Sequence, residues 1–412
     1  MGYVSLKVQY IDGTKIESAA GRYTFVWKGS VEKNKAKLEK KIESVLSDIE
    51  SQIKEDQSEL GRDETPLPID STALRDRLSA LNEKLREAGK STLKQLKKLR
   101  EEHLPRLEKY EKQLAVLGER NSYSKTDVDA TFMRLKDDHM QNGQLKAAYN
   151  TQISTEEQFI THYSIHQSAG DTTTLKDHLE GFEENYHSRS EAVVADAGYG
   201  SEENYEMLES KGIEGYVKYN YFHKEQKLAQ KNNPFLLQNL YYNKEEDFYV
   251  CPMGQKMAFA GKGIRKSTNG YSSRVSYYQA KRCEGCPLRG QCHKAQGNRL
   301  IEVNHRLNEL KAKARQRLTS ETGLYHRSKR PIEVEAVFGQ MKSNNKFNRF
   351  TMRGLEKVDI EFALMCIGHN LRKWSKKLLK TTSSGPDDQP KYNNPLTYGL
   401  HWVNYPYQPM AA

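Results

Sequence analysis

The segment EAVVADAGYGSEENY at residues 191–205 gives the clearest indication of the fold. Its apolar run predicts a buried strand ending at Asp196, and Gly198 and Gly200 predict a turn directly after it. Ser201, followed by two glutamates, is typical of a helix N-terminus. A strand, a turn and a helix in this order indicate an α/β protein with Asp196 at a strand end.

The N-terminal segment predicts another strand that ends in a carboxylate. Residues 3–11 alternate apolar and polar side chains and run into Ile11-Asp12-Gly13-Thr14, which places Asp12 at the strand's exit. Further strands are expected at 149–154 and 159–166, joined by a polar turn at 155–157. Two such carboxylates can share a cation, although an Asp that merely caps a turn gives the same pattern.

A long helical segment separates the first strand from the later ones. Apolar residues recur there at alternating four- and three-residue steps, which is typical of a coiled-coil seam. The breaker GRDETPLPID at 61–70 interrupts the pattern. The simplest prediction is an inserted hairpin of two long helices, with the Pro-containing stretch as its turn. The seam positions are Leu38, Ile42, Val45 and Ile49, then Leu74, Leu78, Leu81 and Leu85, then Leu107, Tyr110, Leu114 and Leu117.

The C-terminal half changes character twice. Residues 219–300 have no helical period and are expected to form short strands and loops around the cysteines, whereas 303–318 and 333–378 return to helix. The tail beyond 380 has the Pro, Ser and Asp content of a disordered segment.

A third carboxylate lies in RPIEVEAVFGQMKSNNKFNRF at residues 330–350. Pro331 suits a helix start, which places Glu335 in the first turns of the helix. Glu333 is the competing choice, about 200° around the helix from Glu335. Three carboxylates can hold a pair of Mg²⁺ or Mn²⁺ ions, which activate water or a 3′-hydroxyl for phosphodiester cleavage.

The net charge favours a polyanionic partner, nucleic acid above all. The formal charge is +11, and Lys and Arg side chains gain affinity by releasing the counterions of phosphates. A charge that serves only solubility is the alternative. The N-terminus lacks the features of a signal peptide and no apolar run is long enough for a membrane span, so a cytoplasmic protein is expected. Candidate DNA contacts, each of which can also be an ordinary solvated side chain, are Arg330, Lys342, Arg349 and Arg353.

Four of the five cysteines are spaced as metal ligands. They occur as CPMG and CEGCPLRGQC, and Cys-x-x-Cys next to Gly or Pro is typical of a zinc knuckle. Reduced thiols without a metal and an iron–sulfur cluster are the alternatives, and His293 is a possible replacement for one cysteine. Cys366, on an apolar helix face, is expected in the core. The predicted Zn²⁺ ligands are Cys251, Cys283, Cys286 and Cys292.

Together these motifs resemble the DDE transposases of bacterial insertion sequences, of the type with a Tyr-Arg-Glu-Lys signature. The resemblance rests on YIDGTKIE at 10–17, KAAYNTQISTEEQFI at 146–160, VVADAGYGSEENY at 193–205 and the segment 334–374. It implies an RNase H-like mixed sheet flanked by helices, with a helical hairpin and a Cys-containing β/loop segment inserted. It also implies metal-dependent cleavage and strand transfer at the ends of the element, with Asp12, Asp196 and Glu335 as catalytic metal ligands.

The same resemblance implies double-stranded DNA as partner, a homodimer on paired ends and association with the nucleoid. The chain departs from the signature at two positions. Pro331 stands where the signature has Arg, and Ser328 stands where it has Tyr, with Arg330 and Tyr325 nearby. Relatives usually carry a helical DNA-binding region ahead of the first strand, which here begins close to Met1. A metal nuclease of the same fold and an inactive remnant that binds DNA are the alternatives.

The domain organisation expected from these readings has a core divided by two insertions. The catalytic core comprises 1–28, 123–218 and 301–380, the inserted helical hairpin comprises 29–122, and the cysteine-containing insertion comprises 219–300. Residues 381–412 form the tail.

Overall fold

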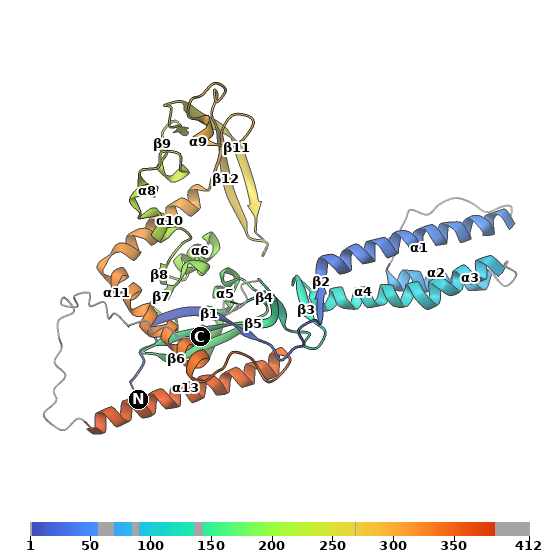
Figure 1. The fold of residues 1–412 in the computed structure, drawn as a ribbon, viewed down its shortest axis with the longest axis horizontal. Helices are drawn as coiled ribbons and strands as arrows, with labels where there is room; N and C mark the ends of the chain where they lie inside the picture. Colours follow the sequence, from blue (N-terminus) through green and yellow to red (C-terminus); the bar gives the residue numbers. More distant parts are fainter. Residues whose placement is uncertain (1, 57–69, 85–89, 136–142, 268, 384–412) are drawn as a thin grey trace, which may run out of the picture.

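A mixed six-stranded sheet is the centre of the fold in the computed structural model, which describes residues 2–56, 70–84, 90–135, 143–267 and 269–383 (Figure 1). Strands β4, β5, β1, β7 and β8 are hydrogen-bonded in that order, and β6 lies beside β4 on the same edge of β5. β1 is antiparallel to β5 and parallel to β7, which is parallel to β8. The chain is therefore a mixed α/β protein. The strands are β1 (Val8–Glu17), β4 (Thr131–Arg134), β5 (Leu145–Glu156), β6 (Phe159–His166), β7 (Ala192–Ala195) and β8 (Glu214–Val217).

Helices cover both faces of this sheet because alternate side chains of each strand point to opposite faces. His162 of β6 packs against Phe182 of α5 (Leu175–Tyr186) on one face. Tyr163, the next residue, packs against Phe362 of α13 (Leu355–Ser383) on the other. The apolar residues of the sheet and of these helices form one buried core.

Asp12 lies inside strand β1, which corrects the expectation that a strand over 3–11 ends there. β1 continues to Glu17 because β5 remains its antiparallel partner, pairing Asp12 with Ile153 and Glu17 with Ala148. Its parallel pairing with β7, however, ends at Tyr10. Asp12 is therefore in the strand but beyond the end of its parallel neighbour.

The two strands predicted at 149–154 and 159–166 are confirmed as a hairpin, but the turn predicted at 155–157 lies at 157–158, because β5 continues to Glu156. β5 and β6 are joined by Glu157 and Gln158, whose φ angles are +54° and +62°. Two consecutive left-handed residues are the conformation that a two-residue hairpin turn requires. The predicted strand before Asp196 is also confirmed, as β7. The predicted helix after Ser201 is confirmed as α6 (Glu202–Ser210), and the Ser201 hydroxyl caps it by accepting a hydrogen bond from the Asn204 amide.

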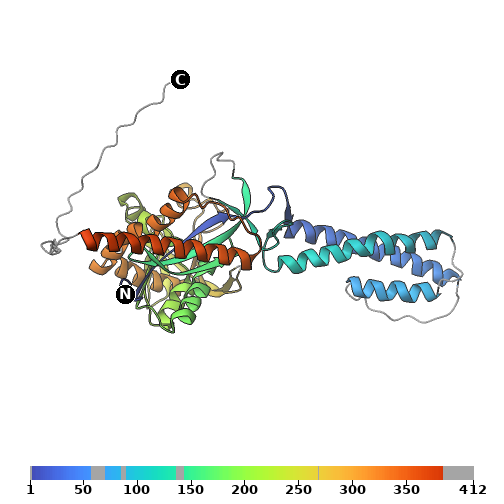
Figure 2. The same ribbon diagram turned by 90° about the horizontal axis from the view of Figure 1, so that it is seen from below.

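The helical insertion projects from the sheet as a long arm (Figures 1 and 2). It contains α1 (Lys28–Asp56), α2 (Ser71–Lys84) and a continuous third helix made of α3 (Lys90–Lys98), the π-helical turn η1 (Leu99–His103) and α4 (Leu104–Leu117). The expected two-helix hairpin is therefore wrong, because α2 folds back antiparallel to α4. Arg75 pairs with Glu108 and the Ser71 amide donates to Glu111, so the first turn of α2 lies against α4 in antiparallel direction.

The predicted seam forms the core of this arm. Leu38, Ile42, Ile49, Leu78 and Leu107 are all buried, together with Leu74. Leu85 and nearly all of the predicted turn at 61–70 lie outside the described residues, and so does the predicted disordered tail from 384 onward. Strands β2 (Phe25–Trp27) and β3 (Ser122–Ser124) pair at the base of the arm and join it to the central sheet.

A second sheet forms a lobe between β8 and the C-terminal helices, where short strands and loops were predicted. Its strand order is β13-β12-β11-β10-β9. Two short helices, α7 (Phe222–Glu225) and α8 (Leu228–Lys231), and the 3-10 turn η4 (Leu237–Asn239) lead into it. The strands are β9 (Tyr241–Asn243), β10 (Phe248–Val250), β11 (Lys256–Lys266), β12 (Ser272–Gln279) and β13 (Leu300–Val303), with α9 (Arg289–Cys292) before β13.

The C-terminal helices follow the prediction only in part. α10 (His305–Thr319) is the expected first helix. The next helical stretch runs through Pro331 instead of starting there, and residues 345–354 separate it from α13, so 333–378 is not one helix. The stretch consists of α11 (Glu321–Arg330), the π-helical turn η5 (Pro331–Glu335), α12 (Ala336–Gly339) and the π-helical turn η6 (Gln340–Asn344).

None of the described helices is both long and apolar enough to span a membrane.

Candidate active site

The three carboxylates singled out in the sequence line one open pocket. Asp12 comes from β1, Asp196 follows β7 and caps the 3-10 turn η3 (Ala197–Tyr199), and Glu335 ends the π-helical turn η5. The Asp196 carboxylate accepts a hydrogen bond from the Gly198 amide at 2.8 Å. The structure therefore brings together three acidic side chains that lie far apart in the chain.

Arg330 lies between these carboxylates. Its Nη2 is 3.1 Å from Asp12 Oδ1 and 4.0 Å from Asp196 Oδ2, and its Nη1 is 2.5 Å from Glu335 Oε1. The side chain of Arg330 is only 7% exposed, against 14% for Asp12 and 49% for Glu335. One guanidinium thus faces three carboxylates, which leaves an excess of two negative charges when all three are ionised.

The π-helical turn explains why Arg330 reaches Glu335. In η5 the Ala336 amide bonds to the Pro331 carbonyl, five residues earlier, instead of four. A wider turn places residues five apart on the same side of the helix. Because Pro331 has no amide hydrogen, it also cannot make the ordinary α-helical bond at this point. Arg330 is five residues before Glu335, so the turn aligns the two side chains.

Glu333, the competing candidate, points away from the pocket. It is 4% exposed, and its carboxylate accepts a hydrogen bond from the Gln158 amide at 2.7 Å in the β5–β6 turn. Burial raises the pKa of this carboxyl. Glu333 therefore fastens the helix to the central sheet, and Glu335 is the member of the pair that lines the pocket.

A buried polar layer lies on the opposite face of β1, and sequence reasoning missed it. Gln152 of β5 accepts from the Tyr199 hydroxyl and donates to Asn150 and to Asp171, a residue of the 3-10 turn η2 (Asp171–Thr173). Burial, together with the nearby Asp12, Asp171 and Asp196, raises the pKa of Tyr199 well above its usual value, so its hydroxyl remains a donor. The layer holds β1, β5 and the segment after Asp196 together.

Gly13 allows this close approach of β1 and the Gln152 side chain. A Cβ atom at Gly13 would lie 2.3 Å from Gln152 Nε2. The only sequence signal for the layer was the polar run at 150–152, between the apolar residues 147–149 and Ile153 of the strand.

Lys218 is a second residue that the sequence did not indicate. It directly follows β8 and its amide bonds to Ala195, the residue before Asp196, at 3.4 Å. Burial and the nearby Arg330 and Arg327 lower its pKa, against the opposing effect of Asp196 and Glu335. A half-buried ammonium group thus stands beside the carboxylates.

The other predicted DNA contacts lie along the edge formed by the end of β1 and the residues after it. Lys342 Nζ donates to the Lys15 carbonyl at 3.3 Å. Arg349 donates to the carbonyls of Ser18 and Ala20, and Arg353 donates to that of Ala19. Arg349 is half-exposed. These contacts orient the basic side chains beside the strand that carries Asp12.

The donor set suits a hard divalent cation, although its side chains do not yet surround one. As they stand, no three His, Cys, Asp or Glu side chains in the described ranges are placed so that they could hold a metal ion. In the pocket this is because the Arg330 guanidinium lies between the carboxylates. Its Nη2 faces the Asp12 carboxylate as an ion pair, while its Nε is buried without a hydrogen-bond partner in the described structure. The excess of negative charge fits a site that accepts further cations, whereas the unbonded Nε can still donate to an acceptor such as a phosphate oxygen.

Residues 250–375 match the family model described as transposase DDE domain. No curated protein and no solved structure matches the chain. The matched region includes Glu335 and the cysteines but neither Asp12 nor Asp196. These two residues are brought to Glu335 by the fold alone. The match supports a DDE transposase, a family of enzymes that cleave DNA and transfer strands.

Proposed function

We propose that this chain is the catalytic part of an insertion-sequence DDE transposase, with an RNase H-like core and Asp12, Asp196 and Glu335 as its catalytic carboxylates. The observation that carries the proposal is the convergence of these three side chains on one buried guanidinium. The mixed sheet supports the proposed core, since β1, β5 and β6 run antiparallel and β7 and β8 continue parallel from β1.

The three carboxylates would hold the Mg²⁺ or Mn²⁺ ions. Such a metal pair would activate water or a 3′-hydroxyl and stabilise the leaving oxygen of a phosphodiester. Asp12 and Asp196 are fixed by strand pairing and by the Gly198 amide, so their positions are set before any ligand binds. Arg330 neutralises part of their charge, and it would turn toward a DNA phosphate when cations take its place.

The basic side chains would position the DNA without reading its sequence. Lys218 stands beside the carboxylates, while Lys342, Arg349 and Arg353 line the end of β1. Phosphate contacts of this kind set the register of a duplex on a protein. These contacts would place the scissile phosphate at the pocket.

Cleavage of the element's own DNA ends tests this proposal. We expect Mg²⁺- or Mn²⁺-dependent cutting by the wild type and a loss of at least about 100-fold, near 2.7 kcal/mol of transition-state stabilisation, for D12N, D196N and E335Q. E333Q is the matched control, because Glu333 lies on the same helical turn but outside the pocket; it should cut normally.

Two results would contradict the assignment. Loss of cutting in E333Q with normal cutting in E335Q would move the third carboxylate, and a wild type that binds the ends without cutting them would indicate a DNA-binding remnant. Joining of pre-cleaved ends to target DNA separates a transposase from a nuclease, because only the former transfers strands.

A further inference from the structure

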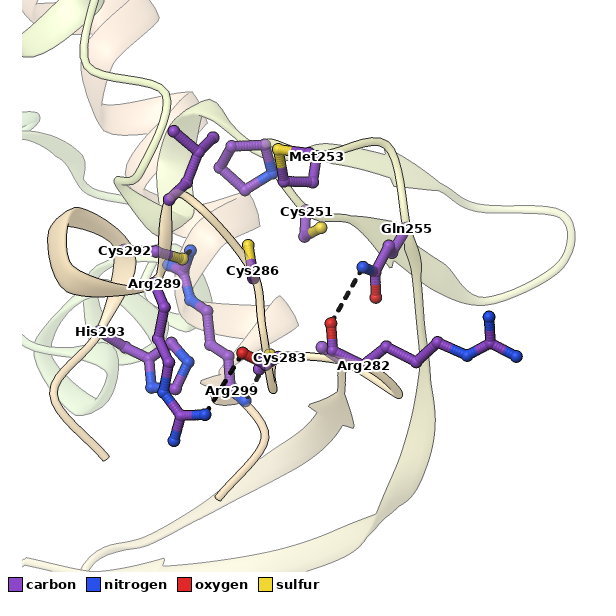
Figure 3. A pocket seen from close by; sticks show the side chains of 13 residues that line it. Cys251, Met253, Gln255, Arg282, Cys283, Cys286, Arg289, Cys292, His293 and Arg299 are labelled. Atoms are coloured by element: carbon purple, nitrogen blue, oxygen red, sulfur yellow. Dashed lines mark hydrogen bonds between the residues drawn. The ribbon is translucent and has the colours of Figure 1, made fainter. Parts of the chain in front are cut away.

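The cysteines of the second lobe meet at one pocket, away from the carboxylates. Cys251 follows β10, whereas Cys283, Cys286 and Cys292 belong to the connection between β12 and β13. All four line the same pocket, together with His293 (Figure 3). Nothing in the proposed DNA chemistry uses these thiols.

Tight turns hold the cysteines on both sides of the pocket. The Gly254 amide bonds to the Cys251 carbonyl at 2.8 Å, and the Cys286 amide bonds to the Cys283 carbonyl at 3.4 Å. Gly254 and Gly285 have φ angles of +76° and +71°, which glycine adopts without strain. Short turns of this kind follow the cysteines of zinc knuckles.

A buried arginine, Arg299, contacts two of the four sulfurs. Arg299 is 8% exposed, and its Nη1 donates to Cys292 Sγ at 3.0 Å while its backbone amide donates to Cys283 Sγ at 3.3 Å. Its Nη2 donates to the Phe235 carbonyl. No carboxylate of the described residues forms an ion pair with Arg299. The buried guanidinium therefore faces the cysteines from inside the lobe, where the negative charge gained on metal binding would offset the cost of its burial.

His293 gives a second, independent indication that the pocket receives a ligand. Both of its ring nitrogens are buried, and neither has a hydrogen-bond partner in the described structure. An imidazole left in this state costs stability, since buried polar groups are almost always bonded. A cation bound in the pocket would lie near this ring, because His293 lines the same pocket as the cysteines.

We propose that Cys251, Cys283, Cys286 and Cys292 bind one structural Zn²⁺ ion. Four thiolates around Zn²⁺ carry a net charge of −2, which Arg299 partly neutralises. The thiols are not yet converged, so binding requires rotation of cysteine side chains between their staggered positions. The ion would tie the turn after β10 to the connection before β13, across a lobe whose own apolar core is small.

The zinc content of the full-length protein tests this proposal. We expect about one zinc per chain by mass spectrometry of the purified wild type, and a loss of at least about tenfold in zinc affinity for each Cys→Ser substitution at the four positions. C366S is the matched control. Cys366 is buried in the α13 core, where burial raises its pKa to about 12, and its replacement should leave the zinc content unchanged.

Cobalt substitution in the wild type keeps the test independent of how the variants fold. Co²⁺ should give the thiolate-to-metal absorption and the visible bands of a tetrahedral four-thiolate site. Loss of zinc in H293A with full zinc in C251S would overturn the four-cysteine assignment. Bound iron in place of zinc, or a wild type that takes up neither Zn²⁺ nor Co²⁺, would overturn the proposal as a whole. None of these results depends on DNA cleavage.

Discussion

Arg330 and the three carboxylates form the charge balance on which the pocket depends. Replacing Arg330 by Gln should lower the free energy of unfolding in EDTA by roughly 2 kcal/mol, because the carboxylates then repel one another. This loss is smaller than the loss expected from breaking a fully buried ion pair, since Glu335 is half-exposed. Mg²⁺ should restore much of the loss. Urea unfolding with and without Mg²⁺ measures both effects.

Lys329→Gln is the control for this prediction, because Lys329 precedes Arg330 and contacts the Tyr325 ring rather than the carboxylates. It should change stability by no more than about 0.5 kcal/mol. A destabilisation of R330Q that Mg²⁺ leaves unchanged would show that the carboxylates do not share a cation site.

Gly13 makes a steric prediction beside the same pocket. Gly13→Ala should cost about 1 to 3 kcal/mol, because the new Cβ must displace the bonded, fully buried Gln152 side chain. Thermal unfolding measures the loss. Gly29→Ala, at the start of α1, is the control, since a Cβ there has open space and should be neutral or slightly stabilising. Equal melting temperatures for G13A and wild type would contradict the packing described.

Buried histidines predict how stability depends on pH. Burial lowers the pKa of His162 to about 4, and burial also lowers that of the neighbouring His178. Both folded values are below the unfolded value near 6.5, so the unfolded chain binds more protons at acid pH and stability falls below pH 6.5. For His162 the fall reaches at most about 3 kcal/mol by pH 4. Urea titrations at pH 7 and 4.5 should show a smaller difference for H162Q than for wild type; an unchanged difference would contradict the prediction.

Among the helices and strands, the sequence predicted those with a clear periodicity or capping pattern. β5, β6, β7 and α6 were found from alternation and capping, and the arm's seam from its four- and three-residue steps. The π-helical turn at Pro331 was missed because proline usually marks a helix start and a five-residue hydrogen bond leaves no residue pattern. The layer around Gln152 was missed because only strand register decides which side chains meet across β1 and β5.

The central sheet should fold independently of the arm. The buried seam of the arm forms a core of its own, and the two ends of the arm meet where the Lys28 amide bonds to Asn121 and β2 pairs with β3. Replacing residues 32–116 by a short Gly-Ser linker should leave the near-ultraviolet circular dichroism and melting temperature of the remainder nearly unchanged, while much helical signal is lost. An aggregated remainder without a cooperative transition would contradict this separation.

At the scale of the whole molecule, the long helix α13 is apolar on two sides. Its buried side packs on the sheet through Val358, Phe362 and Cys366. On its other side, exposed apolar residues recur at steps of four and three, the spacing by which one helix packs along another. The proposed function requires two DNA ends to be brought together, so a second copy of this chain is the expected partner on that side. The exposed residues are Ile360, Leu364, Ile367 and Leu371.

Light scattering after size-exclusion chromatography tests this pairing. The wild type should elute as a dimer at micromolar concentration, and a double substitution, Leu364→Glu with Ile367→Glu, should give a monomer, because charges in a helix seam lose their hydration on association. Leu228→Glu is the control. Leu228 is 75% exposed on α8, away from the exposed apolar side of α13, and its substitution should leave the dimer intact. The double variant should still unfold cooperatively as a folded monomer, since neither residue is buried in the single chain. A wild type that remains monomeric, or a double variant that stays dimeric, would exclude α13 as the surface on which two copies meet.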